Sequence, residues 1–502
     1  MADQKRSGAL LSYVYLALKV VIGIVYTPIM LRYLGQAEYG VYTEALTVIS
    51  FLTMLDLGFG QTLIHYNVKY RTENDYEKAD RCNGLFLVMY TVIGILALFV
   101  GFWCARNCGL LFLTFTADEL SLLTSVIEIL VISLAVSFPL SVFSALINAN
   151  QRFTFAKIAD IVSYILQYGG ILVVLLMGHK SIGIAVVTTV VSIGMKLVLA
   201  VYCMVKIKPK FIFTGFDSTL VRTIFMYSAF IFLNIVIDQL YADTDKFILG
   251  AVCSSAAVAT YNVGVQFSAY FTQLSTAISG VFLPQITQIY TTEHSVEKLS
   301  EIFVRIGRLQ FVLLSFVLSG FVAFGQLFIN LLAGSENAAA YWIAVIIMVP
   351  SIVPLSQNIG IAVLQAMNKH RFRSLIYFLI ALLNVAVSIP LAQRYAGVGA
   401  AIGTTLACLA GQYLTMNIFY SRKIGLDVKG YWKQAGSVTL RMLPMAIPAI
   451  LINMLIPGGG WLTFLARIMA YTVIYIPYAY KFVFGDYEKN LIKSIMNKLR
   501  RV

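Results

Sequence analysis

Charged side chains and long polar segments are both scarce in this chain of 502 residues. Only 12% of the residues are charged, whereas 59% are hydrophobic and the mean hydropathy is +0.83. A soluble domain has about 25% charged and about 45–50% apolar residues. This composition excludes a soluble fold of such length, and the lack of a long polar segment leaves no room for a soluble catalytic domain.

Residues that commonly bind metals are also few. The chain has four His and six Cys, and the cysteines are scattered along it. Cys104 and Cys108 lie four residues apart, but no cluster of His accompanies them, so the spacing does not predict a metal or redox site. No acid/base pair or phosphate-binding loop is evident in the sequence. We therefore expect a protein that is not an enzyme and that uses no cofactor.

Apolar segments of helical length fill most of the chain. A helix of about 20 apolar residues spans the hydrocarbon core of a bilayer. The sequence predicts an all-α polytopic membrane protein with about 14 transmembrane helices, at 10–34, 41–66, 84–105, 120–147, 158–178, 182–205, 224–250, 257–290, 308–333, 341–367, 374–393, 398–421, 438–456 and 461–484. The first segment is too long for a signal-peptide core, so we interpret it as a retained span.

Lys and Arg lie mainly in alternate gaps between these segments. With a cytoplasmic N-terminus, the outer ends and loops hold only Arg32, Arg106, Lys180 and Arg394, and four further cations lie within spans. Cytoplasmic loops of membrane proteins are enriched in Lys and Arg. The pattern predicts cytoplasmic N- and C-termini. It also accounts for the net charge of +14 without nucleic-acid binding, because no basic patch is interleaved with aromatic residues.

The two halves of the chain repeat one another. Gly, Ala and Thr recur in residues 183–189 and 399–405 at an offset of 216, and Leu-Gly at 34–35 recurs at 249–250. Internal repeats are common in transporters. We expect two six-helix lobes, residues 1–206 and 207–421, followed by two extra helices in 422–484 and a basic cytoplasmic tail in 485–502.

Short motifs add a resemblance to a known family. Arg-Tyr-Leu-Gly at 32–35 with Glu-Tyr-Gly at 38–40, Asp-Leu-Gly-Phe-Gly at 56–60, Asn-Gln-Arg-Phe at 150–153 and Asp-Lys-Phe-Ile-Leu-Gly at 245–250 occur in this order. In these motifs and in its arrangement of spans, the chain resembles the Wzx-type oligosaccharide flippases of the multidrug/oligosaccharidyl-lipid/polysaccharide exporter superfamily. The resemblance covers essentially the whole chain.

The resemblance implies a V-shaped pair of lobes that works by alternating access, with spans one, two, seven and eight facing a central cavity. The implied activity is transfer of undecaprenyl-pyrophosphate-linked oligosaccharide from the inner to the outer leaflet of the bacterial cytoplasmic membrane, for O-antigen, capsule or exopolysaccharide. Its implied partners are this polyprenyl-linked substrate, membrane lipid, and a polysaccharide polymerase or chain-length protein. Two alternatives stay open: a drug/cation antiporter of the same superfamily and a lipid II flippase.

Three of these four spans carry a polar and aromatic stripe on one face, because spacings of three, four and seven residues align side chains on a helix. Hydroxyls, amides, carboxylates and aromatic rings all suit a sugar. The stripes are Ser12, Tyr15, Lys19 and Tyr26 in the first span, Asn234, Asp238, Tyr241 and Asp245 in the seventh, and Gln266, Tyr270 and Gln273 in the eighth.

Ionisable residues inside spans are costly and are functional candidates by default. Lys19 is our first candidate for contacting the pyrophosphate, and Lys196 is a weaker one. Among the acidic residues, Asp238, Asp56 and Glu44 are candidates for coupling or gating, with a proton or a sodium ion as the coupling ion. Asp56 precedes Gly58 and Gly60, which suggests a hinge.

Overall fold

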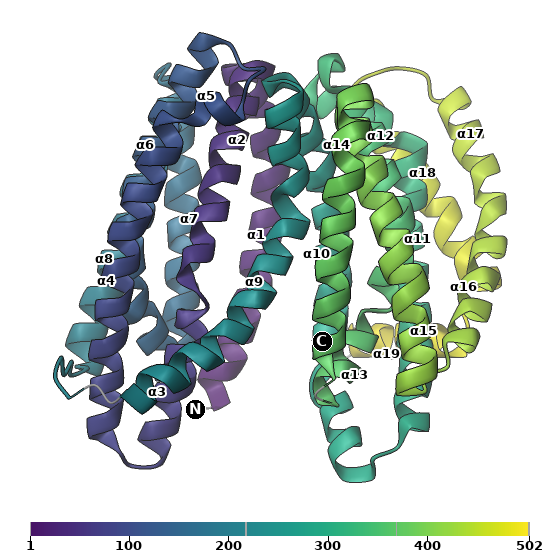
Figure 1. The fold of residues 1–502 in the computed structure, drawn as a ribbon. Coiled ribbons are helices and arrows are strands. Elements are labelled where there is room, and N and C mark those ends of the chain that lie inside the picture. The colour runs from purple at the N-terminus through teal and green to yellow at the C-terminus, as the bar shows by residue number, and fades with distance from the viewer. Residues whose placement is uncertain (1, 216–217, 368, 500–502) are drawn as a thin grey trace. The chain divides into compact units, whose positions relative to one another are not determined.

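The computed structural model describes residues 2–215, 218–367 and 369–499, and every element in these residues is a helix (Figure 1). The predicted all-α fold is therefore confirmed. Arg500 and Arg501 of the predicted basic tail lie outside the described residues. The helices form two compact units, Met1–Ala259 and Thr260–Val502, which we describe one at a time.

Unit 1 is built around α6, which contacts α2, α3, α4 and α8. Its elements are α1 (Ala2–Leu34), α2 (Gln36–Leu52), η1 (Thr53–Asp56), α3 (Phe59–Thr72), α4 (Tyr76–Arg106), α5 (Cys108–Leu111), α6 (Ala117–Ala149), α7 (Phe153–Leu176), α8 (Lys180–Tyr202), η2 (Cys203–Ile207) and α9 (Ser218–Val252). The start of α6 is fixed by a capping box, in which Glu119 N donates to Thr116 Oγ1 and Thr116 N donates to Glu119 Oε2.

Unit 2 is built around α11, which contacts α12, α16, α17 and α18. Its elements are α10 (Ser255–Glu293, which begins in unit 1), α11 (Val296–Ala333), η3 (Ser335–Asn337), α12 (Ala339–Ser356), α13 (Asn358–Ala366), α14 (His370–Cys408), η4 (Leu409–Met416), α15 (Asn417–Phe419), η5 (Tyr420–Ile424), α16 (Val428–Met442), η6 (Leu443–Met445), α17 (Ala446–Leu455), α18 (Trp461–Tyr478), η7 (Ala479–Val483) and α19 (Asp486–Leu499).

Twelve helical segments of the described residues are long and apolar enough to cross a membrane. One of them, Phe372–Ile424, is 53 residues long and is interrupted at Ala396, whose φ is 48° and ψ −132°. The 39-residue α10 is not among the twelve, although its length exceeds that of a span. Dividing the long segment at Ala396 and adding α10 accounts for the fourteen predicted spans. The protein is a multi-pass membrane protein.

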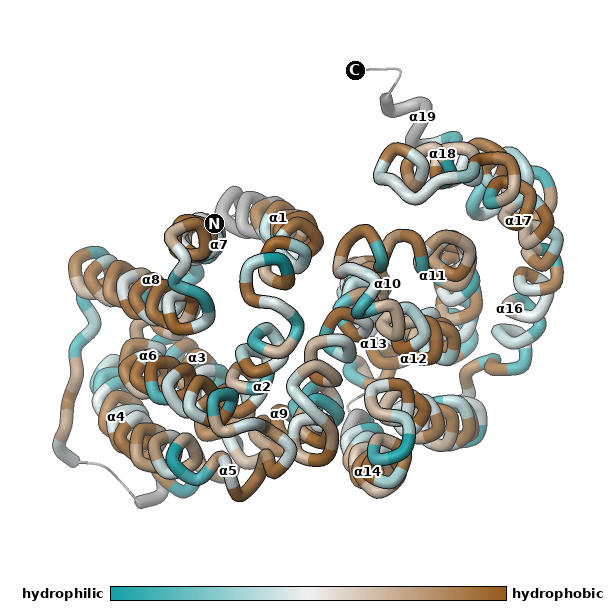
Figure 2. Tube along the Cα trace, turned by 90° about the horizontal axis from the view of Figure 1, so that it is seen from above, coloured by the Kyte–Doolittle hydropathy of each residue, from teal (hydrophilic) through white to brown (hydrophobic). Residues whose placement is uncertain are grey.

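Hydrophobic residues occupy much of the length of these helices (Figure 2), and many of their side chains are exposed. Phe99 on α4 is 70% exposed, Val473 on α18 is 70% exposed and Leu462 on α18 is 84% exposed. A monomeric soluble protein rarely exposes large contiguous apolar patches. In a bilayer the same side chains contact lipid, which agrees with the predicted spans.

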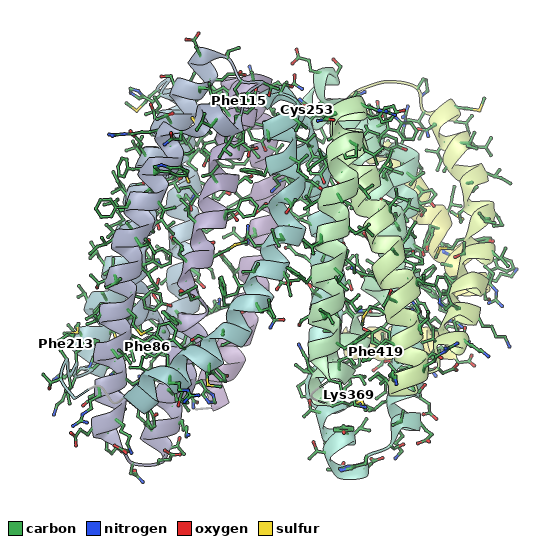
Figure 3. The ribbon with its side chains drawn as sticks, viewed as in Figure 1. Phe86, Phe115, Phe213, Cys253, Lys369 and Phe419 are labelled. Carbon is green, nitrogen blue, oxygen red and sulfur yellow. The ribbon has the colours of Figure 1, made fainter. Side chains whose placement is uncertain are left out.

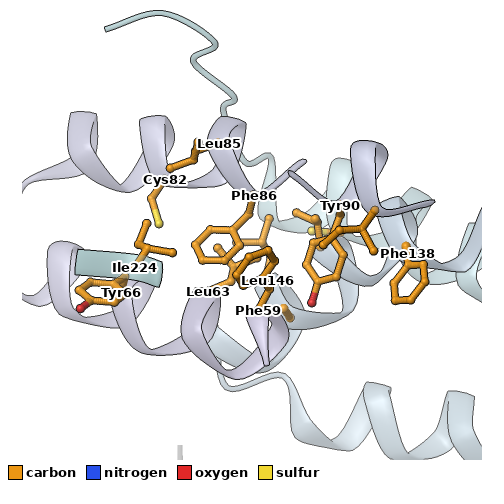
Figure 4. Close-up of a cluster of buried hydrophobic side chains, with 14 of the residues drawn as sticks. Phe59, Leu63, Tyr66, Cys82, Leu85, Phe86, Tyr90, Phe138, Leu146 and Ile224 are labelled. Carbon is orange, nitrogen blue, oxygen red and sulfur yellow. The ribbon is translucent and has the colours of Figure 1, made fainter. Parts of the chain in front are cut away.

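The interior of unit 1 holds an aromatic cluster between α3, α4 and α6 (Figure 4). Phe59 meets Phe86 edge-on with ring centroids 5.7 Å apart, and Tyr90 lies 6.1 Å away in a similar geometry. Edge-to-face pairs add stability beyond the buried area. Figure 3 shows Phe86 and Phe213 near one end of unit 1, and Phe115 and Cys253 at the other end.

The second predicted span, 41–66, is a broken helix. It consists of α2, η1 and α3, with Leu57 and Gly58 between them in the left-handed region at φ 52° and 74°. Gly58 has no side chain to oppose this conformation, and Leu57 pays a steric cost there. The aromatic cluster that begins at Phe59 packs the second arm in place.

Candidate substrate and coupling sites

The first polar stripe lies along the seam between α1 and α7. Tyr15 meets Tyr164 edge-on at 5.7 Å between ring centroids, and Tyr26 meets Tyr168 at 4.5 Å. Tyr164 and Tyr168 lie 4.5 Å from each other. Two residues of the predicted stripe therefore pack against α7, and the seam presents a run of four phenol rings.

Two lysines flank the first of these rings. The Nζ atom of Lys19 lies 5.8 Å from the ring centroid of Tyr15, and the Nζ atom of Lys157 lies 5.7 Å from the same centroid. Both distances are within the range of cation–π attraction. Lys19 is exposed, while Ser12, seven residues before it on the same face, is half-buried. The seam thus combines two ammonium groups with aromatic faces.

The residues that α7 contributes to the seam are not among the predicted site residues. Lys157 precedes the predicted span 158–178 but lies within α7, and its Nζ lies 2.8 Å from Asp160 Oδ2. Lys157, Asp160, Tyr164 and Tyr168 are separated by three, four and four residues, so they share one face of α7. The same periodicity can be read from the sequence, but it lies in the fifth predicted span, which the family resemblance does not place at the central cavity.

The stripe on α9 lies on the side of that helix away from α2. Asn234, Asp238, Tyr241 and Asp245 share one face, whereas the residues that meet α2 lie roughly 120–180° around the helix. Asn234 and Asp238 are exposed, Tyr241 is half-buried and Asp245 is buried. The stripe therefore runs from an exposed half to a buried end.

A hydrogen-bonded network joins α2 to the opposite face of α9. Ser50 Oγ donates to Asp243 Oδ2 at 2.7 Å, and the amide of Gln239 donates to both Ser50 and Asp243. Lys246 Nζ lies 2.8 Å from Asp243 Oδ1. Glu44 of α2 is fully buried next to the same face of α9, where a Cβ atom at Gly250 would lie 2.7 Å from its carboxyl group.

The break in the second helix places Asp56 inside unit 1. Its Oδ1 accepts a hydrogen bond from the hydroxyl of Tyr90 at 2.5 Å, and Tyr90 is fully buried. Lys196 of α8 donates to Ser137 O of α6 at 3.2 Å and to Ser141 Oγ at 2.8 Å. Lys196 is therefore held by α6, and the carboxylate of Asp56 by α4.

The third stripe belongs to unit 2. The amide of Gln266 donates to the hydroxyl of Tyr270 at 2.7 Å, and both side chains are half-buried, as is Gln273. Phe267 packs edge-on against Phe328 of α11, with centroids 5.4 Å apart. Within the described residues, no group of three or more His, Cys, Asp and Glu could hold a metal ion.

Comparisons with known proteins agree with this architecture. A family model described as polysaccharide biosynthesis protein matches residues 6–290. A probable low-salt glycan biosynthesis flippase, Agl15, of Haloferax volcanii is 22% identical over 225 residues. The match covers 45% of this chain and 47% of that protein, so the chain spans about half the length of this curated relative.

Solved structures of transporters share the fold. The lipid II flippase MurJ in an inward closed conformation has a TM-score of 0.76 at 16% identity, covering 96% of this chain and 100% of that chain. An inward-facing MATE family transporter of the MOP superfamily has a TM-score of 0.63 at 15% identity, covering 80% of this chain and 99% of that chain. Because the family model matches more than half of the sequence, this chain belongs to the polysaccharide biosynthesis protein family, and its fold is that of the MOP superfamily transporters.

Proposed function

We propose that this protein flips undecaprenyl-pyrophosphate-linked oligosaccharide units from the cytoplasmic to the outer leaflet, as a Wzx-type flippase of surface polysaccharide biosynthesis. The family match and the glycan flippase among its relatives support a lipid-linked glycan as the cargo. Alternating access between lobes 1–206 and 207–421 would carry the head group across. Both termini would lie in the cytoplasm of a bacterial cell.

The observation that carries the proposal is the α1–α7 seam. A lipid-linked pyrophosphate is multiply negative, and an unpaired charge is costly in a low-dielectric region. Lys19 and Lys157 place two ammonium groups around the ring of Tyr15, and because Lys157 is paired with Asp160, Lys19 is the stronger candidate for the anion. The tyrosines that continue along the seam offer aromatic faces to sugar rings. The stripe on α9 would supply amide and carboxylate partners for the glycan.

Lys19→Ala tests this proposal. We expect it to abolish complementation of a flippase-null strain at normal expression, measured as export of surface polysaccharide. Lys69→Ala is the matched control, because Lys69 is also exposed and lies 6.0 Å from a tyrosine ring, that of Tyr70, but is outside the seam. Full complementation by Lys19→Ala would remove Lys19 from the substrate path.

The substrate class needs a separate experiment. We expect the null strain to accumulate a lipid-linked oligosaccharide in the inner leaflet, detected by mass spectrometry of extracted lipids. Rescue of cells depleted of their lipid II flippase, without such accumulation, would instead favour the lipid II alternative. Increased resistance to cationic drugs without either effect would favour the antiporter.

A further inference from the structure

Glu44 lies near the middle of α2 and is 0% exposed. Within the described residues, neither of its carboxylate oxygens has a hydrogen-bond partner. Buried polar atoms in native proteins are nearly always hydrogen-bonded. A fully buried carboxyl group without a hydrogen-bond partner is therefore unusual. We ask which protonation state of Glu44 is compatible with this environment.

The charged groups that act on Glu44 both come from α9. They are Lys246 and Asp243. No charged side chain of the described parts of α1, α4, α6 or α8, the other long helices that contact α2, is among its interactions. Lys246 is already paired with Asp243 at 2.8 Å. The pair is neutral as a whole, so it offers little compensation to a second carboxylate.

The shape of α9 allows this arrangement. Asp243, Lys246 and Gly250 are separated by three and four residues and share one face of the helix. A Cβ at Gly250 would lie 2.7 Å from Glu44 Oε2 and 3.1 Å from Phe112 Cε1. The absence of a side chain at Gly250 therefore makes room for the carboxyl group of Glu44, which lies between α9 and an aromatic ring.

Burial without a hydrogen bond disfavours the charged form of a carboxyl group. An ionised Glu44 would also stand beside Asp243, and two carboxylates would then compete for one ammonium group. A neutral Glu44 avoids both costs. It also leaves the network of Ser50, Gln239, Asp243 and Lys246 as the structure has it.

We propose that Glu44 is a proton-binding site, and that the Lys246–Asp243 pair of α9 senses its charge. In the described state Glu44 carries the proton. When the proton leaves to water, the ammonium group of Lys246 is shared between Glu44 and Asp243. This sharing weakens the bonds that Asp243 makes with Ser50 and Gln239 across the α2–α9 contact. Only the use of this proton in transport rests on the proposed function; the protonation of Glu44 does not.

Infrared spectroscopy of the purified full-length protein in lipid tests the proposal without substrate. Incorporation of glutamate with a ¹³C side-chain carboxyl identifies the C=O stretch of any protonated Glu. We expect such a band at neutral pH in the wild type, and its complete loss in Glu44→Gln. Glu128→Gln is the matched control, because Glu128 also lies on a transmembrane helix, is one-third exposed and has Arg106 at 3.9 Å. It should keep the band.

Absence of a label-sensitive band in the wild type at neutral pH would overturn the proposal, and so would its persistence in Glu44→Gln. Glu44→Asp is a second variant that keeps a carboxyl group at this position, so the labelled-glutamate band should disappear while an unlabelled one remains. These outcomes are independent of flipping. A protein with the band and no complementation would refute the proposed function alone.

Discussion

The second predicted span, which comprises α2, η1 and α3, and the eighth, which lies within α10, differ in the backbone of one short segment. The offset of 215 that relates Leu-Gly at 34–35 to 249–250 sets Asp56-Leu57-Gly58 against Phe271-Thr272-Gln273. In the first half the chain leaves the helix there, with Leu57 and Gly58 in the left-handed region. In the second half α10 runs through without interruption for 39 residues. The left-handed backbone of Leu57 and Gly58 therefore distinguishes the α2–α3 segment from α10, which has a similar length.

On either side of the break, α2 and α3 both form hydrogen bonds with α9. The two arms pack on successive parts of α9: α2 meets Asp243 through Ser50, and α3 meets Ser228 through Thr62, whose hydroxyls are 2.8 Å apart. His65 also stacks on Tyr227, with centroids 4.7 Å apart. Hinge residues are commonly a few positions at the ends of elements, where the backbone dihedrals can change. We therefore keep a hinge at Asp56 as a proposal and test what holds it.

Gly58→Ala should have the largest effect on the broken helix. A non-glycine residue in the left-handed region costs about 1–2 kcal/mol. The new Cβ would also lie 2.6 Å from Ile231 Cγ2 of α9, and overpacking costs about 1–3 kcal/mol. We expect a loss of about 3 kcal/mol, measured as a lower midpoint in thermal unfolding of the purified protein.

Gly280→Ala in α10 is the matched change in the unbroken helix. A Cβ at Gly280 meets nothing within 4 Å, and Ala is favoured over Gly in a helix interior by about 0.5–1 kcal/mol. We expect a midpoint equal to or above that of the wild type. If both substitutions shifted the midpoint equally, the left-handed step would not be what separates the two helices.

Much of the architecture could be predicted from the sequence because it depends on local composition. The apolar runs predicted the spans, but the second span was predicted as one continuous segment, 41–66, and its break at Leu57 and Gly58 was not predicted. By contrast, the interruption at Ala396 falls between two predicted spans, 374–393 and 398–421. The predicted span 257–290 falls within α10, although its Gln, Ser and Thr residues make this helix less apolar than the twelve segments.

The partners of the site residues could not be predicted in this way. Periodicity within one helix places Lys19 and Tyr15 on a common face, but the contact with Lys157 depends on how α1 packs against α7. Lys246 pairs with Asp243 within α9, as a spacing of three residues allows, but the hydrogen bond between Ser50 and Asp243 depends on how α2 packs against α9. Such pairings depend on the packing of two helices, which no single stretch of sequence encodes.

Tyr90→Phe should have an intermediate effect on the broken helix. It removes the hydroxyl that donates to Asp56 and keeps the ring in the aromatic cluster. A hydrogen bond to a charged group contributes about 1.5–3 kcal/mol, so we expect a loss of about 2 kcal/mol in thermal unfolding. Tyr270→Phe on α10 removes the bond from Gln266, where both partners are half-buried. A loss at Tyr270 as large as that at Tyr90 would contradict a special role for Asp56.

We expect the smallest effect at the N-terminal caps of α4 and α11, because α4 is capped by a carboxylate and α11 by a hydroxyl group. Asp75 Oδ1 accepts from Lys78 N at 3.1 Å at the start of α4, and Ser295 Oγ accepts from Lys298 N at 3.2 Å at the start of α11. The hydrogen bond from the Lys78 side chain holds the pKa of Asp75 below its ordinary value. The folded state therefore gains from an ionised Asp75 above the unfolded pKa, and this gain is lost as the pH falls through the lowered pKa.

Hydrogen exchange separates the two caps. As the pH falls below about 4, the usual range of Asp, we expect the protection factor of the Lys78 amide to decrease while that of the Lys298 amide stays constant. Asp75→Ser should make the first turn of α4 behave like that of α11, because a hydroxyl does not titrate in this range. Equal acid sensitivity of both amides, or an unchanged response in Asp75→Ser, would show that the ionised carboxylate is not what distinguishes the two helix starts.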